Sequence, residues 1–185
     1  MLIVGDNQGE KLMATRQQNV AKISRQDNDK VVAWNFFEAS KLISITGNGE
    51  VKLTASDVDI LNDEIKKAGF DASLVYDADP KFVVGEIVSL TPHPDSDHLN
   101  IAQVNIGDEA PIQIVAGAPN ARVGLKTIVV LPGAMMPNGG LIFAGQLRGV
   151  PSHGMMASPR ELALPNAPQK RGIIELASTE IDRKS

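Results

Sequence analysis

The segment Phe82-Val83-Val84-Gly85-Glu86-Ile87-Val88 restricts the possible folds of this chain more than any other stretch of its sequence. Its β-branched and aromatic residues predict a strand. The glycine in its middle predicts a bend or bulge of the kind that tightly coiled barrel strands need. Toward the C-terminus, four more strands are expected over Leu99–Ile106, Ile112–Val115, Lys126–Leu131 and Leu141–Leu147. Five short strands with irregular connections are typical of a small Greek-key barrel, although other small β-barrels share this pattern.

The segment Asp77-Ala78-Asp79-Pro80 marks a change of pattern, and we expect a domain boundary there. The dipeptide Asn48-Gly49 predicts a hairpin turn that leads into Val51–Leu53, because both central residues of a type I′ turn need positive φ. Before that turn, strands are expected over Val20–Ile23, Val31–Phe37 and Leu42–Ile45.

One helix is expected between the turn and the boundary. Thr54 or Ser56 supplies its N-cap, and Gly69 supplies a left-handed stop. Apolar side chains recur along one face at helical spacing, at Val58, Leu61, Ile65 and Ala68. The protein is therefore expected to be mainly β, with a small α+β domain over residues 1–79, a five-stranded barrel domain over residues 80–176 and a polar tail over residues 177–185.

Composition restricts the class of protein. The 185 residues include no cysteine, which excludes disulfides and thiolate zinc sites. The hydrophobic fraction of 43% is enough for a folded core, which must consist mainly of aliphatic residues and Met because aromatic residues make up only 4%. No apolar run approaches the ~18 residues that span a bilayer, and the first residues lack the features of a signal peptide. A cytoplasmic location is the resulting expectation.

Charge is distributed unevenly along the chain. Residues 1–80 hold 9 Lys and Arg against 13 Asp and Glu, a balance of 9 − 13 = −4, and residues 81–185 hold 9 of each, a balance of 9 − 9 = 0. The pI is about 5.4, whereas a nucleic-acid-binding domain usually has a pI above ~9. Nucleic-acid binding is therefore expected to be modest and to depend on shape. The acidic pI favours a competing class, a chaperone-like module whose barrel groove binds peptide.

Four sequence blocks of the expected barrel occur in the order of a known family, namely Val83-Val84-Gly85-Glu86-Ile87, His93-Pro94-Asp95-Ser96-Asp97-His98-Leu99, Ile114-Val115-Ala116-Gly117-Ala118-Pro119-Asn120 and Leu147-Arg148-Gly149-Val150-Pro151-Ser152-His153-Gly154-Met155. With these blocks, residues 81–165 resemble the tRNA-binding domain at the N-terminus of the phenylalanyl-tRNA synthetase β subunit. The segments Trp34–Ser40 and Lys66–Phe70 are similar to the N-terminal extension of stand-alone bacterial tRNA-binding proteins of the YtpR type. The resemblance implies an OB-fold and a non-catalytic tRNA-binding protein without a cofactor. It leaves open a homodimer, and a partner such as an aminoacyl-tRNA synthetase or a translation factor.

The resemblance also assigns residues to an RNA-binding face. The implied RNA-binding residues are Asn120, Arg122, Lys126, Arg148, Ser152, Gly154 and Met155. Ser152 would donate or accept a hydrogen bond, and Met155 would make an apolar contact with an unstacked base. The three cations would contact phosphates or bases, and Asn120 would read a base edge. Each residue has a structural alternative: the methionine can belong to the core, the cations to the solvated surface, and Asn120 to a loop cap.

The loop His93-Pro94-Asp95-Ser96-Asp97-His98 has a density of imidazole and carboxylate groups that imitates a metal site. Its proline and small polar residues are also typical of a connection between strands, and we expect that structure and no metal. The family usually has Lys or Arg at the position of His98, so this chain has one positive charge less near the expected RNA face. A metal-dependent enzyme built on this loop is a further alternative.

Motifs of catalysis are absent from the sequence. Ser152 and His153 are adjacent, which places their side chains on opposite faces of an extended segment. A G-x-S-x-G elbow, a phosphate-binding glycine loop with Lys and an H-E-x-x-H motif do not occur. We therefore expect a binding protein and not an enzyme.

Overall fold

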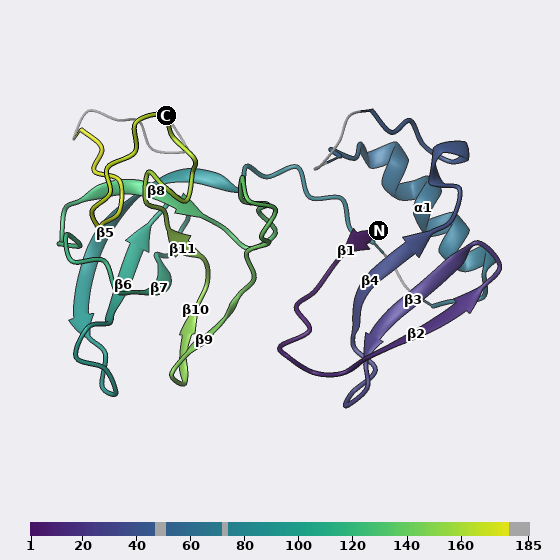
Figure 1. Cartoon of the computed structure of the whole chain (residues 1–185), viewed down its shortest axis with the longest axis horizontal. Helices are drawn as coiled ribbons and strands as arrows, with labels where there is room; N and C mark the ends of the chain where they lie inside the picture. The colour runs from purple at the N-terminus through teal and green to yellow at the C-terminus, as the bar shows by residue number, and fades with distance from the viewer. Residues whose placement is uncertain (47–50, 72–73, 178–185) are drawn as a thin grey trace. The chain divides into compact units, whose positions relative to one another are not determined.

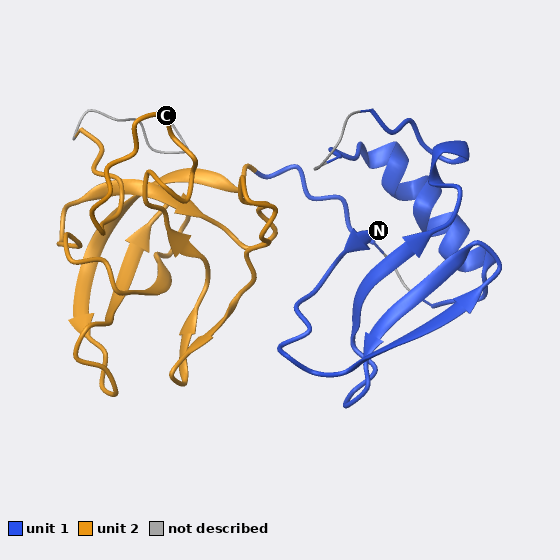
Figure 2. Cartoon of the chain, viewed as in Figure 1, with its two compact units in different colours: residues 1–79 blue, residues 80–185 orange. Residues whose placement is uncertain are grey.

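The computed structural model describes residues 1–46, 51–71 and 74–177 of the chain. The chain forms two compact units, residues 1–79 and residues 80–185 (Figure 2). Strands make up most of the regular structure described in both units, so the expected mainly β class is confirmed. Within the described ranges, no helix combines the length and apolar character needed to cross a membrane. The expected polar tail lies outside the described residues from residue 178 onward.

Unit 1 is built on a four-stranded antiparallel sheet (Figure 1). Its strands are β1 (Leu2–Ile3), β2 (Leu12–Gln17), β3 (Val20–Arg25) and β4 (Val31–Phe36), in the order β1-β4-β3-β2. Trp34 is almost fully buried, and its ring meets that of Phe70 edge-on with 5.4 Å between centroids. Val20 and Trp34 pack against residues of the single α-helix, so the core of this unit lies between the sheet and the helix.

The helix α1 (Ala55–Lys67) begins and ends as its sequence predicts. Thr54 is the N-cap: its hydroxyl accepts a hydrogen bond from the Asp57 N–H, and the Asp57 carboxylate accepts one from the Thr54 N–H, which completes a capping box. Gly69 has φ +84° and ends the helix, with the Phe70 N–H donating back to the Ile65 carbonyl in a Schellman arrangement. The predicted apolar face is buried at all four positions, Val58, Leu61, Ile65 and Ala68.

The expected strand over Leu42–Ile45 is wrong. A short 3₁₀-helix, η1 (Ala39–Lys41), precedes it, and Glu38 enters that helix with φ +58°. The Leu42 N–H donates to the Ala39 carbonyl and so continues the turn beyond the helix. The flanking segment Val51–Leu53 is not a strand either, and the predicted turn at Asn48-Gly49 lies outside the described residues.

Unit 2 is a five-stranded antiparallel barrel that is nearly closed, which confirms the expected OB-type architecture. Its strands are β5 (Phe82–Pro92), β6 (Asn100–Asn105), β7 (Ile112–Ala116), β8 (Lys126–Val130) and β11 (Met155–Met156), in the order β11-β8-β5-β6-β7. Residues beside β11 close the barrel against β7, because the His153 N–H donates to the Gln113 carbonyl at 2.8 Å. Apolar side chains from all five strands fill the interior.

Gly85 has a different role from the bend that the sequence predicts. A Cβ atom at this position would lie 2.7 Å from Val129 Cγ2 and 2.8 Å from Val104 Cγ1, so a side chain does not fit between β8 and β6. The register shift of β5 occurs further along, between Ile87 and Ser89. The glycine therefore permits close packing inside the barrel, and the bulge of β5 lies at Ile87–Ser89.

The fifth expected strand, Leu141–Leu147, is only partly a strand and is not part of the barrel sheet. Its end forms β9 (Gly145–Leu147), which pairs with β10 (Val150–Ser152) in a separate two-stranded sheet. Arg148 and Gly149 connect the two with φ +46° and +80°, the positive values of a type I′ turn. The fifth barrel strand is instead β11, and its two residues are too few to be predicted from a pattern of alternation.

Candidate functional site

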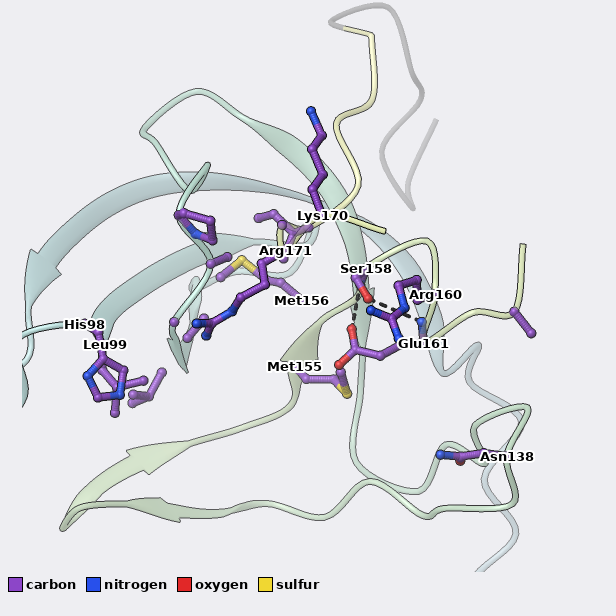
Figure 3. A pocket seen from close by; sticks show the side chains of 18 of the residues that line it. His98, Leu99, Asn138, Met155, Met156, Ser158, Arg160, Glu161, Lys170 and Arg171 are labelled. Atoms are coloured by element: carbon purple, nitrogen blue, oxygen red, sulfur yellow. Dashed lines mark hydrogen bonds between the residues drawn. The ribbon is translucent and has the colours of Figure 1, made fainter. Parts of the chain in front are cut away.

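A cleft of about 850 Å³ opens on unit 2 beside the edge strands β7 and β11 (Figure 3). Its walls come from the end of the loop between β5 and β6, from the segment after β7, and from the chain that follows β11. In an OB barrel, the second and third strands and the loops after the first and fourth strands form the usual ligand surface. The cleft includes part of this surface, from the loop after β5, from β7 and from the loop after β8, and extends onto the chain that follows β11. Its lining includes His98, Leu99, Val115, Gly117, Asn138, Met155, Met156, Arg160, Lys170, Arg171 and Ile173.

Three cations surround the cleft, and the resemblance assigned none of them. Arg160, Lys170 and Arg171 are all exposed, and none of them takes part in an ion pair within the described part of the chain. In Figure 3, Arg171 reaches toward the space between His98 and Met155, whereas Lys170 extends away from it. Among the described residues of the lining, Glu161 alone has a carboxylate, which accepts a hydrogen bond of 2.7 Å from the Ser158 N–H. The cleft therefore has a net positive charge in a unit whose sequence has none.

The two adjacent methionines of β11 have different environments. Met156 is 5% exposed and belongs to the barrel core. Met155 pairs with Val130 in β8, is only half-buried, and lines the cleft. Of the two methionines, only Met156 belongs to the core, and the contact of Met155 with a base stays a prediction. Met155 supplies the flexible apolar surface of the cleft.

Ser152 and Gly154 support the strand that carries Met155. Ser152 is 4% exposed, and its hydroxyl accepts a hydrogen bond from the Val115 N–H at 3.0 Å while donating to the Gly154 carbonyl at 3.2 Å. Gly154 has φ +131°, and a Cβ atom there would lie 2.6 Å from the Val130 carbonyl oxygen. Ser152 thus ties the chain that leads into β11 to β7, Gly154 lets the same chain pass close to Val130 of β8, and the Ser152 hydroxyl has no capacity left as a donor. Their contact with RNA stays a prediction.

Asn120 and Arg122 contact the C-terminal segment of the unit. The Asn120 side-chain amide donates to the Ile173 carbonyl and accepts from the Ile173 N–H, both at 2.9 Å. Arg122 Nη2 lies 2.8 Å from Glu175 Oε2, and Asn120 also donates to that carboxylate. These hydrogen bonds from Arg122 and Asn120 lower the pKa of Glu175 to about 2. Neither residue lines the cleft.

Lys126 and Arg148 lie outside the cleft as well. Lys126 is half-buried in β8, opposite Glu86 of β5. Arg148 is exposed at the tip of the β9–β10 hairpin, and its guanidinium donates to the Asp95 carbonyl at 2.6 Å. Of the seven residues that the resemblance implied, the cleft brings in only Met155. The RNA contacts of the others stay predictions.

The loop from His93 to His98 has the structure of a connection between strands. His93 is 3% exposed: its Nδ1 accepts from the Asp95 N–H at 3.0 Å, and its Nε2 lies 3.1 Å from the Leu147 carbonyl, to which it donates. At the other end of the loop, the hydrogen bond with His98 lowers the pKa of Asp97. No three histidine or carboxylate groups gather into a metal-binding cluster among the residues described. His93 instead fastens this loop to the β9–β10 hairpin.

One feature of the sequence could have indicated two of the cleft cations. Lys170 and Arg171 are adjacent and directly precede Gly172 in a segment without apolar periodicity. Such a segment is normally interpreted as a solvated connection, because its path depends on contacts with distant residues. Its contact partner Asn120 lies 53 residues away from Ile173.

Comparisons with known proteins divide the chain at the same place as its two units. A family model described as "Putative tRNA binding domain" matches residues 82–181, and one described as "Domain of unknown function (DUF4479)" matches residues 7–77. The chain is 41% identical over 167 residues to the Bacillus subtilis "Putative tRNA-binding protein YtpR", an alignment that covers 90% of this chain and 83% of that protein.

Phenylalanine–tRNA ligase β subunits resemble the C-terminal part. The identity is 40% over 119 residues for Idiomarina loihiensis and 49% over 96 residues for Rhodospirillum rubrum. These alignments cover 63% and 51% of this chain but only 15% and 12% of the two subunits. The similarity to the ligases is thus confined to a small part of their length.

Proposed function

The chain belongs to the family of tRNA-binding proteins that includes Bacillus subtilis YtpR, and on this basis we propose that it binds tRNA at the cleft of unit 2 without altering it chemically. The observation that carries the proposal is that Arg160, Lys170 and Arg171 line the cleft together with the half-buried Met155, and that Arg171 reaches toward Met155 (Figure 3). Phosphates supply most of the affinity of RNA for proteins, and an unstacked base needs an apolar surface. This cleft offers groups for both.

The charge of the protein determines how tightly this site binds. The chain has a net charge of −4, so long-range attraction of RNA is weak and the local cations must supply the electrostatic part of the affinity. Three phosphate contacts give a slope of log affinity against log salt of about −2 to −3. Raising the salt concentration from about 50 to about 200 mM should therefore weaken binding roughly 15- to 60-fold.

The other residues that the sequence assigns to the RNA-binding face have different roles in this proposal. Arg148 lies at the tip of the hairpin and would contact RNA that extends beyond the cleft. Ser152, through Val115 of β7, and Gly154, through its close approach to Val130 of β8, would act by holding the chain that carries Met155 in place. Arg122 and Lys126 are further candidates for phosphate contacts outside the cleft. A second copy of the chain would double a weak site and raise its avidity, and an aminoacyl-tRNA synthetase or translation factor would be the class of protein partner.

The test is equilibrium binding of labelled bulk tRNA to the wild type and to Met155→Ala. Loss of an apolar contact worth about 1 kcal/mol would weaken binding roughly fivefold. Met13→Ala is the matched control, because Met13 is an exposed methionine of β2 in unit 1. Equal affinity of the two variants would contradict the assignment of Met155. Absence of tRNA binding by the wild type at low salt would favour the peptide-binding class over RNA.

A further inference from the structure

The segment from Lys170 to Leu176, which we call the strap, crosses unit 2 after the last barrel strand. It is attached to the barrel along its length: the Ile174 N–H donates to the Ala157 carbonyl and the Leu176 N–H donates to the Lys126 carbonyl, both at 2.9 Å. Ile173 is 7% exposed and packs into the barrel core. The strap is thus part of the folded unit, and it carries Lys170 and Arg171 at its start.

One side chain holds the strap where it passes the cleft. The amide of Asn120 pairs with both backbone groups of Ile173, donating to its carbonyl and accepting from its N–H, as a neighbouring strand would. Its second N–H donates to Glu175. All the donors of this amide are therefore used inside the protein, which leaves none to read a base edge.

Gly172 allows the strap to lie this close to Asn120. Its φ is +146°, and a Cβ atom there would lie 2.9 Å from Asn120 Oδ1 and 3.1 Å from Asn120 Cγ. A side chain at position 172 would therefore push the strap off the Asn120 amide. Arg171 directly precedes Gly172. Its Nη2 lies 3.9 Å from the place that a Cβ atom of Gly117 would occupy on the cleft wall. The position of its guanidinium thus depends on how the strap is held.

We propose that Asn120 and Gly172 are positioning residues for RNA binding, which hold the strap so that Arg171 reaches into the cleft. This inference rests on the proposed function and replaces the direct base contact expected for Asn120. The ion pair between Arg122 and Glu175 is exposed, so it adds little to the attachment of the strap. The Asn120 amide, the buried Ile173 and the backbone hydrogen bonds of Ile174 and Leu176 supply most of it, and of these only the Asn120 amide forms its hydrogen bonds through a side chain.

Salt dependence separates positioning from direct contact. Arg171→Ala removes one phosphate contact and should make the slope of log affinity against log salt less steep by about 0.7 to 0.9. Asn120→Ala changes no charge. If Asn120 acts through Arg171, the slope should nevertheless decrease by a similar amount, and the double variant should bind tRNA no more weakly than Arg171→Ala alone. If Asn120 contacts a base, the affinity should fall while the slope stays that of the wild type.

The experiment measures tRNA affinity at four or more salt concentrations for the wild type, the three variants above and Gly172→Ala. Circular dichroism establishes that each variant is folded. Gly172→Ala leaves Asn120 in place, so it tests the same mechanism if Asn120→Ala does not fold, and it should show the same decrease in slope. A wild-type slope in folded Asn120→Ala or Gly172→Ala would overturn the inference and leave the proposed function intact. Absence of tRNA binding by the wild type would overturn both.

Discussion

Replacing Gly154 with alanine should strongly destabilise unit 2, because all the atoms that the added Cβ atom would meet belong to the backbone. The added Cβ atom would lie 2.6 Å from the Val130 carbonyl oxygen, and φ is +131°, a value that non-glycine residues rarely adopt. The backbone strain costs about 1–3 kcal/mol, and moving a packed backbone to relieve the overlap costs a similar amount. Together they amount to a loss of about 2–6 kcal/mol in the free energy of unfolding.

Thermal and urea unfolding followed by circular dichroism would measure this loss. For a domain of this size, it corresponds to a decrease in Tm of about 10–30 °C. Gly124→Ala is the matched control, because Gly124 has φ +83° but nothing within 4 Å of the added Cβ atom. It should cost only the backbone strain, about 1–2 kcal/mol. If Gly154→Ala is no less stable than Gly124→Ala, the close contact with Val130 does not exist as described.

Three further predictions concern stability. The pKa of Glu175 in the folded protein is about 2, below its ordinary 4.5, so the stabilisation from its contacts is present above about pH 4.5 and is lost as the pH falls toward 2. In urea unfolding, the difference in stability between the wild type and Glu175→Gln should therefore shrink over that pH range. A difference that stayed constant would contradict the contacts between Glu175 and its partners. Thr54→Ala removes the capping box of α1 and should lower the unfolding free energy of unit 1 by about 1 kcal/mol, with Ser56→Ala as a neutral control. His93→Ala leaves the Leu147 carbonyl without its donor and should cost about 1–3 kcal/mol in urea unfolding, whereas a stoichiometric metal ion bound to the wild type and lost in this variant would contradict the structural role.

The features that the sequence predicts well are those set by neighbouring residues. The limits of α1 follow from Thr54 and Gly69, and its buried face follows from the spacing of apolar residues. Four barrel strands are recovered because each contains enough β-branched residues to form a pattern. Strand β2 was missed since all six of its residues are exposed, so it has no alternation of buried and exposed positions.

The features that the sequence does not predict depend on contacts between distant residues. Ser152 is a polar residue whose partner, the Val115 N–H, becomes apparent only when the barrel closes. Asn120 has its partner on the strap, 53 residues further along the chain. From the sequence, a side-chain amide that binds the backbone of a distant residue cannot be distinguished from one that binds an RNA base. Lys170 and Arg171 were missed for the same reason, because the path of the strap that carries them depends on contacts with distant residues such as Asn120.

The most direct test of the central claim is the salt dependence of tRNA binding by Arg160→Ala/Lys170→Ala/Arg171→Ala, measured beside Lys30→Ala, which removes an exposed cation of unit 1. With the cleft as the site, removing its three cations should make the slope of log affinity against log salt less steep by about 2 to 3. Lys30→Ala should keep the wild-type slope. A folded triple variant that binds tRNA with the slope and affinity of the wild type would contradict the account.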